Sequence, residues 1–244
     1  MQSGHVDHVV DRKVAAADLS LSILITAASA DRALRADERL KTLRSHTSAN
    51  VQVVYWDPAP AVEASADVEV ASLLAGGRRL GPPEQYLRGR WTDRDWRNVP
   101  GAFYGARTDS CWTGREIAPL HVVYEAEFGG EIVYRQPTNS SEVQLLLTAA
   151  WSDPFCAYAA DGDEHWTLDL VRQWWTEREW LAAWIDQVQH QWSASDRADE
   201  RDNAAGLVEF GRYLDDGLEA DLRDYGFWLD NRRPRQPREA LPSL

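Results

Sequence analysis

The sequence predicts an α+β fold with an N-terminal α/β (βαβ-like) segment, a central β-hairpin and a helical, acidic C-terminal half. Short apolar runs flank a leucine-spaced stretch near the N-terminus, Gly129-Gly130 separates two strand-like runs, and apolar residues after Trp166 recur every three or four positions. At 244 residues and 44% hydrophobic side chains, the chain is long enough to bury a substantial core. We expect an α/β segment (1–80), an α+β domain (81–232) and a disordered tail (233–244), although the first two could be one fused domain.

The N-terminal segment has the pattern of a β-α-β unit. Leu19–Thr26 and Val51–Trp56 are apolar runs typical of strands, and the stretch between them carries leucines at helical spacing. Val68–Ala75 is either a third strand or a short helix, because periodicity does not distinguish the two. Gly76–Pro83 is rich in glycine and proline, which makes it the best candidate for a domain boundary.

This opening resembles a known family over part of its length. Ile23–Asp57 resembles the first strand, helix and second strand of bacterial TIR-like domains, with one strand that ends near Ser29 and Asp31 and another that closes on Trp56-Asp57. The resemblance implies a TIR-like α/β domain, and some members of that family cleave NAD with a glutamate further along the chain. Glu84 is loosely placed for that role, but the two prolines before it depart from the family pattern, so the activity is not carried over.

The centre of the chain predicts a hairpin. His121–Phe128 and Glu131–Gln136 flank Gly129-Gly130, and two glycines that tolerate positive φ favour a two-residue turn. With that turn, four side chains share one face and are expected to point inward: Tyr124, Ala126, Phe128 and Val133.

A helix should follow the hairpin. Asn139 with Glu142, or Ser141 with Gln144, forms a capping box, and Asp153-Pro154 ends the helical pattern. The expected apolar stripe consists of Val143, Leu146, Leu147, Ala150 and Trp151.

Two longer helical patterns complete the chain. Thr167–Trp192 is one helix or two abutting helices, because Arg178 interrupts the apolar seam and Thr176 with Glu179 forms another capping box. Ala204–Leu229 continues the pattern and can split at Asp216-Gly217. The expected apolar positions are Val171, Trp174, Leu181, Ile185, Val188, Trp192, Leu207, Phe210, Leu214, Leu218, Leu222, Tyr225 and Leu229.

The negative charge of the chain lies in its C-terminal half. Residues 1–100 hold 13 acidic and 13 basic side chains, whereas residues 151–232 hold 19 acidic and 7 basic ones. A field of this sign repels nucleic acid and anionic membranes and attracts basic partners. It is also what a solvated helical surface that keeps a protein soluble would show.

Cysteine usage and targeting patterns favour the cytoplasm. Cys111 and Cys156 give neither a disulfide framework nor a zinc spacing. Leu19–Ala27 followed by Ala28-Ser29-Ala30 imitates a secretory signal, but the preceding segment lacks the positive flank that a signal peptide requires. No apolar run approaches the length of a membrane span.

Two segments gather groups that could do chemistry. Asp109–Glu116 contains Cys111, Arg115 and Glu116, and Cys111 could act as a nucleophile if His121 or His165 reached it as a base. Arg115 could bind a carboxylate or a phosphate through two of its guanidinium nitrogens. A buried structural cysteine and a structural ion pair of Arg115 are the commoner alternatives.

The second segment is Asp161–His165. Asp161, Asp163 and His165 could hold a divalent cation, although their spacing fails the EF-hand pattern and no cofactor motif is present. An acidic turn that leads into a helix N-terminus explains the same residues without a metal.

Function is not decided by these patterns. The leading hypothesis is a protein-interaction protein, adaptor-like or immunity-like, that binds a basic protein through an acidic, tryptophan-rich face, with no nucleic acid and no membrane as partner. Its alternative is an enzyme whose pocket joins Asp109–Glu116 to Asp161–His165 and takes a small or nucleotide-like substrate. The tryptophans expected to bind the partner are Trp174, Trp175, Trp180 and Trp184.

Overall fold

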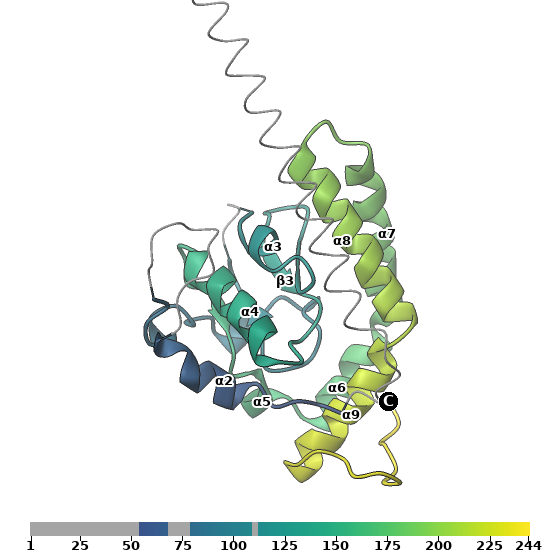
Figure 1. Ribbon diagram of the computed structural model, residues 1–244. Coiled ribbons are helices and arrows are strands. Elements are labelled where there is room, and N and C mark those ends of the chain that lie inside the picture. Colours follow the sequence, from purple (N-terminus) through teal and green to yellow (C-terminus); the bar gives the residue numbers. More distant parts are fainter. Residues whose placement is uncertain (1–53, 68–78, 109–111) are drawn as a thin grey trace, which may run out of the picture. The chain divides into compact units, whose positions relative to one another are not determined.

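The computed structural model describes residues 54–67, 79–108 and 112–244, which all belong to one compact unit, Val53–Leu244 (Figure 1). Most of the predicted N-terminal β-α-β segment, its TIR-like resemblance and the Val68–Ala75 element lie outside these residues. The unit is mixed and mostly helical, with two small sheets. In the described part, no helix combines the length and apolar character needed to cross a membrane.

Short elements precede the hairpin. Proline has no N–H of its own that would lack an acceptor in the first turn of a helix, which suits Pro60 and Pro83, each in the first turn of a short helix. These elements are α2 (Ala59–Glu63), η1 (Ala64–Asp67), η3 (Pro83–Gln85), η4 (Trp91–Asp93), β1 (Tyr104–Gly105) and α3 (Gly114–Ile117).

Both sheets are antiparallel pairs. Strand β2 (Val122–Tyr124) pairs with β3 (Glu131–Val133), and β1 pairs with β4 (Tyr158–Ala159). The buried amide of Asn98 joins the pairs, because its Oδ1 accepts the N–H of Gly105 at 2.9 Å and of Val133 at 2.8 Å. One side chain therefore satisfies backbone groups of both sheets, as a buried polar group must.

The predicted hairpin is present, but its turn is longer than two residues. Strand pairing stops at Tyr124 and Glu131, and the buried carboxylate of Glu125 accepts the N–H groups of Glu127, Phe128 and Gly130. This loop turns Phe128 outward, where it is 75% exposed, so its expected inward orientation was wrong. Tyr124 and Val133 are buried as predicted.

Helix α4 (Ser140–Ser152) follows its predicted signals. The Asn139 side chain accepts the Glu142 N–H at 3.1 Å, and the Glu142 carboxylate accepts the Thr138 N–H at 2.7 Å. Of the predicted stripe, Trp151 is half-buried, whereas four side chains are fully buried: Val143, Leu146, Leu147 and Ala150.

The tryptophan-rich segment forms two helices that break at Glu177. After the short α5 (Gly162–His165) come α6 (Leu168–Thr176) and α7 (Arg178–Ser193). The second predicted capping box does not form, because the Thr176 hydroxyl donates to the Gln173 carbonyl and no side chain caps α7. The six expected apolar positions of this segment are all buried.

The last two helices separate at the predicted place. Helix α8 (Ala198–Asp215) ends before Gly217, whose φ of +117° suits glycine, and α9 (Leu218–Asn231) follows. Helices α7 and α8 pack side by side along their length (Figure 1). Asn203 of α8 pairs with the edge of β2, since its amide accepts the Tyr124 N–H at 2.8 Å and donates to the Tyr124 carbonyl at 3.0 Å.

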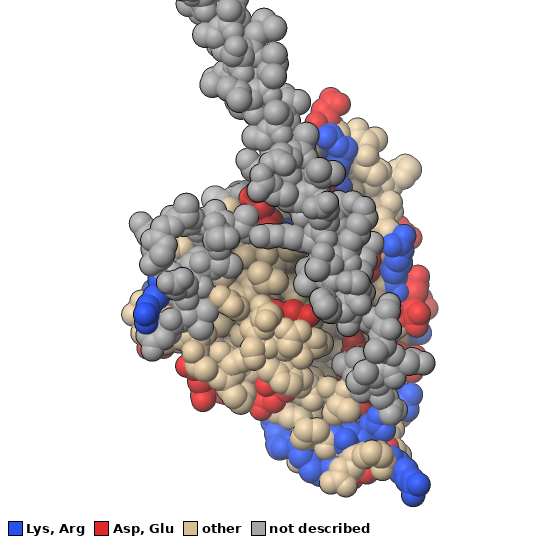
Figure 2. Space-filling view, in the orientation of Figure 1, with Lys and Arg blue, Asp and Glu red and all other residues tan. Residues whose placement is uncertain are grey.

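The tail, which we expected to be disordered, instead packs against α6 and α9. Arg235 pairs with Asp224 at 3.0 Å, and both side chains are buried. Arg172 and Arg223 donate to the carbonyls of Ser243 and Pro242. Basic side chains gather at the lower end of the unit in Figure 2, so the acidic excess of the C-terminal half is not spread evenly over its surface.

Candidate functional site

The four tryptophans predicted to bind a partner have different environments. Trp174 is buried, and its indole N–H donates to the Trp96 carbonyl at 2.7 Å, so it belongs to the core. Trp175 and Trp184 are half-buried. Trp180 is 77% exposed, and exposed rings of this size indicate an interaction surface when several of them lie together.

We give the name aromatic strip to four exposed or half-buried rings that lie on α7 and on two segments linked to it through Arg97: Trp96, Phe128, Trp180 and Trp184. Trp180 and Trp184 lie one turn apart on the same face of α7. The Arg97 guanidinium links the rest, because it lies 4.9 Å from the Trp184 ring and 5.6 Å from the Trp96 ring. It also pairs at 3.8 Å with Glu125, which shapes the loop that carries Phe128.

Carboxylates border the aromatic strip. Glu127 is exposed beside Phe128, and Glu177 and Glu179 are exposed at the start of α7 next to Trp180. The one arginine in this stretch of α7, Arg178, lies 5.0 Å above the Trp175 ring. The surface around the strip is therefore negative on balance, in keeping with the net charge of −13.

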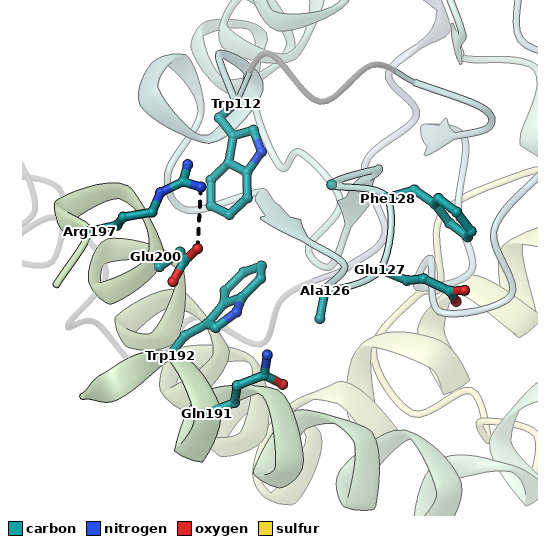
Figure 3. Close-up of a pocket in the computed structure, with 9 residues that line it drawn as sticks. Trp112, Ala126, Glu127, Phe128, Gln191, Trp192, Arg197 and Glu200 are labelled. Atoms are coloured by element: carbon teal, nitrogen blue, oxygen red, sulfur yellow. Dashed lines mark ion pairs between the residues drawn. The ribbon is translucent and has the colours of Figure 1, made fainter. Parts of the chain in front are cut away.

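A cavity of about 480 Å³ lies between the Phe128 loop, the C-terminal end of α7 and the start of α8, and Phe128 is the one member of the strip that lines it (Figure 3). This size is within the usual range of about 300–1,000 Å³ for ligand sites. The indoles of Trp112 and Trp192 and the Arg197–Glu200 ion pair form one wall, whereas the Phe128 ring points away from the two indoles. We call it the Trp112 cavity; its lining is Trp112, Ala126, Glu127, Phe128, Gly129, Gln191, Trp192, Arg197 and Glu200.

Trp112 is held in an unusual conformation at this cavity. Its φ of +64° is rare for a bulky residue and costs about 1–3 kcal/mol. Ring contacts compensate, because the Trp112 indole lies 4.6 Å from Tyr124 and 5.1 Å from Trp192. The position of Trp112 is thus fixed by the hairpin on one side and by α7 on the other.

In the first candidate catalytic segment, Asp109–Glu116, the contacts of Arg115 are structural. Arg115 is 4% exposed, and its guanidinium donates to the carbonyls of Pro119 (2.7 Å) and Val122 (3.1 Å) and pairs with Asp202 at 2.8 Å. It therefore ties α3 and the start of β2 to α8. Glu116 is exposed on α3, and Cys111 lies outside the described residues.

The acidic turn distributes its groups among different partners. Asp163 accepts the hydroxyls of Tyr55 and Tyr225, each at 2.7 Å, and burial raises the pKa of its carboxyl although these hydrogen bonds oppose the shift. Asp161 accepts the Tyr104 hydroxyl at 2.8 Å and lies 3.2 Å from the ring nitrogen of His165. The two carboxylates thus serve different tyrosines.

This arrangement does not assemble the predicted metal site. Within residues 54–67, 79–108 and 112–244, no group of three or more histidines, cysteines, aspartates or glutamates is placed to hold a metal ion. His165 instead stacks on Trp91 at 4.9 Å.

The two candidate catalytic segments belong to separate contact clusters. Arg115 packs with α8 and the hairpin, whereas His165 packs with Trp91 and Asp161. Neither the Trp112 cavity nor the cavity between α2 and α4 is lined by His165. Nothing in these contacts brings the imidazole to a substrate-sized hollow.

Comparison with family models, with curated proteins and with solved structures finds no match to this chain. Sequence reasoning missed Trp96, Phe128 and Trp112 as surface or cavity residues. For Phe128, the segment Glu125–Gly130 (EAEFGG) contained a usable signal. A carboxylate placed just before unpaired backbone N–H groups can cap a loop as it caps a helix, and such a loop turns Phe128 outward.

Proposed function

We propose that this protein is a docking protein that binds a basic, partly apolar segment of another protein through the aromatic strip. One observation carries the proposal: Phe128 and Trp180 are 75% and 77% exposed, and the Arg97 guanidinium connects Trp184 of α7 with Trp96 and with Glu125 of the Phe128 loop. Exposed aromatic side chains on a rigid support are the usual anchors of protein interfaces.

The charge around the strip indicates the chemistry of the partner. Glu127, Glu177 and Glu179 border the aromatic rings, and the whole chain has a net charge of −13. Such a border favours lysine and arginine on the partner and accelerates their approach at low salt. The rings then supply the apolar contact area that gives the complex its lifetime.

The support of the strip is rigid enough for this role. Trp180 and Trp184 project from α7, whose neighbouring face is buried through Leu181, Ile185 and Val188. The Phe128 loop is fixed by three backbone N–H groups that donate to one carboxylate. Little conformational entropy is therefore lost from this surface when a partner binds.

The test uses a short synthetic peptide that alternates lysine and leucine, with a glutamate–leucine peptide as its counterpart, in a calorimetric titration. We expect the lysine peptide to bind and the glutamate peptide not to bind. Trp180→Ala and Phe128→Ala should each weaken binding about tenfold or more, as interface anchors do. Both side chains are exposed, so the folded structure should persist.

The control is Phe155→Ala. Phe155 is 69% exposed after α4 and is not part of the aromatic strip, so its removal takes away the same ring without touching the proposed interface. Equal losses from Phe128→Ala and Phe155→Ala, or undiminished binding after Glu177→Lys with Glu179→Lys, would contradict the proposal.

A further inference from the structure

The Trp112 cavity contains the parts of a guanidinium site. The Trp112 indole presents a face on which a planar cation can stack, and the Glu200 carboxylate lies at the same wall (Figure 3). A guanidinium stacks on aromatic rings and pairs with a carboxylate through a planar fork of N–H groups, which a lysine ammonium cannot do. The combination therefore favours arginine over lysine.

An arginine of the chain itself already shows this geometry. The Arg197 guanidinium carbon lies 5.2 Å from the Trp112 ring centroid, and its nitrogens lie 2.6 Å from Asp199 and 3.4 Å from Glu200. The side chain is 59% exposed, so these contacts are surface contacts that water and other ions can replace. Arg197 thus lies at the edge of the cavity without being locked there.

We propose that the Trp112 cavity accepts an arginine side chain of the basic partner, and that Arg197 occupies the edge of this site until the partner displaces it. The inference rests on the proposed docking function, because Phe128 belongs to both the strip and the cavity. The strip holds the apolar part of the partner, and the cavity selects one arginine next to it.

The charges around the cavity indicate that the partner's arginine replaces Arg197 and does not bind beside it. Asp199, Glu200 and Glu127 are the carboxylates at or beside the cavity, and Arg197 is the cation paired with the first two. Once Arg197 moves away, two carboxylates are left for the incoming guanidinium. Both arginines cannot share the same carboxylates and ring face, so the two compete.

The first experiment probes the cavity alone. Nα-acetylarginine methylamide and its uncharged isostere, Nα-acetylcitrulline methylamide, are titrated into the protein while the indole N–H signals of Trp112 and Trp192 are followed by NMR. We expect the arginine probe to shift these signals with a Kd of about 1–10 mM, which is the affinity range of a small ligand that makes one ring contact and one ion pair. The citrulline probe should leave the signals unchanged.

Matched variants on α8 separate competition from general charge effects. Arg197→Ala should strengthen binding of the arginine probe about threefold to tenfold, whereas Arg212→Ala should not, although both remove one exposed arginine that pairs with a nearby acid on α8. Glu200→Gln should weaken binding about tenfold, and Glu209→Gln should leave it unchanged.

The outcomes distinguish this inference from the docking function. If the lysine–leucine peptide binds through the strip but the arginine probe leaves Trp112 and Trp192 unmoved, the cavity proposal is wrong and the docking function stands. If the arginine probe binds with the expected Arg197 and Glu200 dependence but no peptide binds, the cavity proposal stands as a site for a small cation and the docking function fails. Equal effects of Arg197→Ala and Arg212→Ala would overturn the competition.

Discussion

Gly206 on α8 provides a test of how the hairpin is joined to the helices that carry the candidate site. A helical glycine replaced by alanine normally gains about 1 kcal/mol of stability. At Gly206 the new Cβ would overlap the buried Arg115 guanidinium, with Nη2 at 2.8 Å and two other atoms nearer still. We expect Gly206→Ala to destabilise the protein instead.

The magnitude follows from the bonds that Arg115 must give up to make room. Its guanidinium donates to the carbonyls of Pro119 and Val122, and hydrogen bonds to charged groups contribute about 1.5–3 kcal/mol each. The pair with Asp202 adds little, because that carboxylate is exposed. Loss of both carbonyl bonds, less the gain in helix propensity, leaves a net loss of about 2–5 kcal/mol.

Urea unfolding of wild type, Gly206→Ala and Gly211→Ala measures this effect. Gly211 lies on the same helix, and its added Cβ would make only an ordinary contact of 3.6 Å with Ile185. Gly211→Ala should therefore stabilise by up to about 1 kcal/mol. If Gly206→Ala stabilises the protein as Gly211→Ala does, the Arg115 anchor is not what holds α8 to the hairpin.

Two further predictions concern buried charge. Burial lowers the pKa of His121, so on acidification the unfolded chain takes up a proton at this residue before the folded protein does. The neutral, buried His121 therefore contributes fully to the free energy of unfolding above about pH 6.5, and this contribution is lost as the pH falls below that value towards the lowered pKa of the folded protein. The free energy of unfolding of His121→Gln should fall less between about pH 7 and pH 5 than that of wild type, and parallel profiles would refute this. Arg235→Ala should cost about 3–5 kcal/mol in urea unfolding because it leaves Asp224 buried without its partner. Arg233→Ala, which removes an exposed arginine paired with Glu239, should change little, and equal effects of the two variants would show that the tail is not anchored by the buried pair.

The helical half could be predicted because its signals are local. Caps at Asn139 and Thr167, the break before Gly217 and the period of the apolar residues each depend on neighbours within one or two turns. The same local logic failed at Phe128, because a two-residue turn and a carboxylate-capped loop compete for the same glycines. The choice between them depends on a buried Glu125, and burial is a tertiary property.

The candidate site was predictable in kind but not in its members. Charge and tryptophan content indicated an acidic, aromatic surface, and Trp180 proved to be exposed. Helical periodicity placed Trp174 among the buried positions, but tryptophan content alone did not separate it from the exposed Trp180, and its hydrogen bond to the distant Trp96 carbonyl has no local signal. A structural ion pair of Arg115 was among the alternatives, but its partner, Asp202 of α8, is too distant in the sequence to be predicted.

The most direct test of the proposed docking function is the calorimetric titration of the lysine–leucine peptide into wild type, Phe128→Ala and Phe155→Ala. We predict binding that weakens at high salt, drops about tenfold or more with Phe128→Ala and stays unchanged with Phe155→Ala. The absence of binding to wild type, or equal binding by all three proteins, would show that the aromatic strip does not take a basic partner.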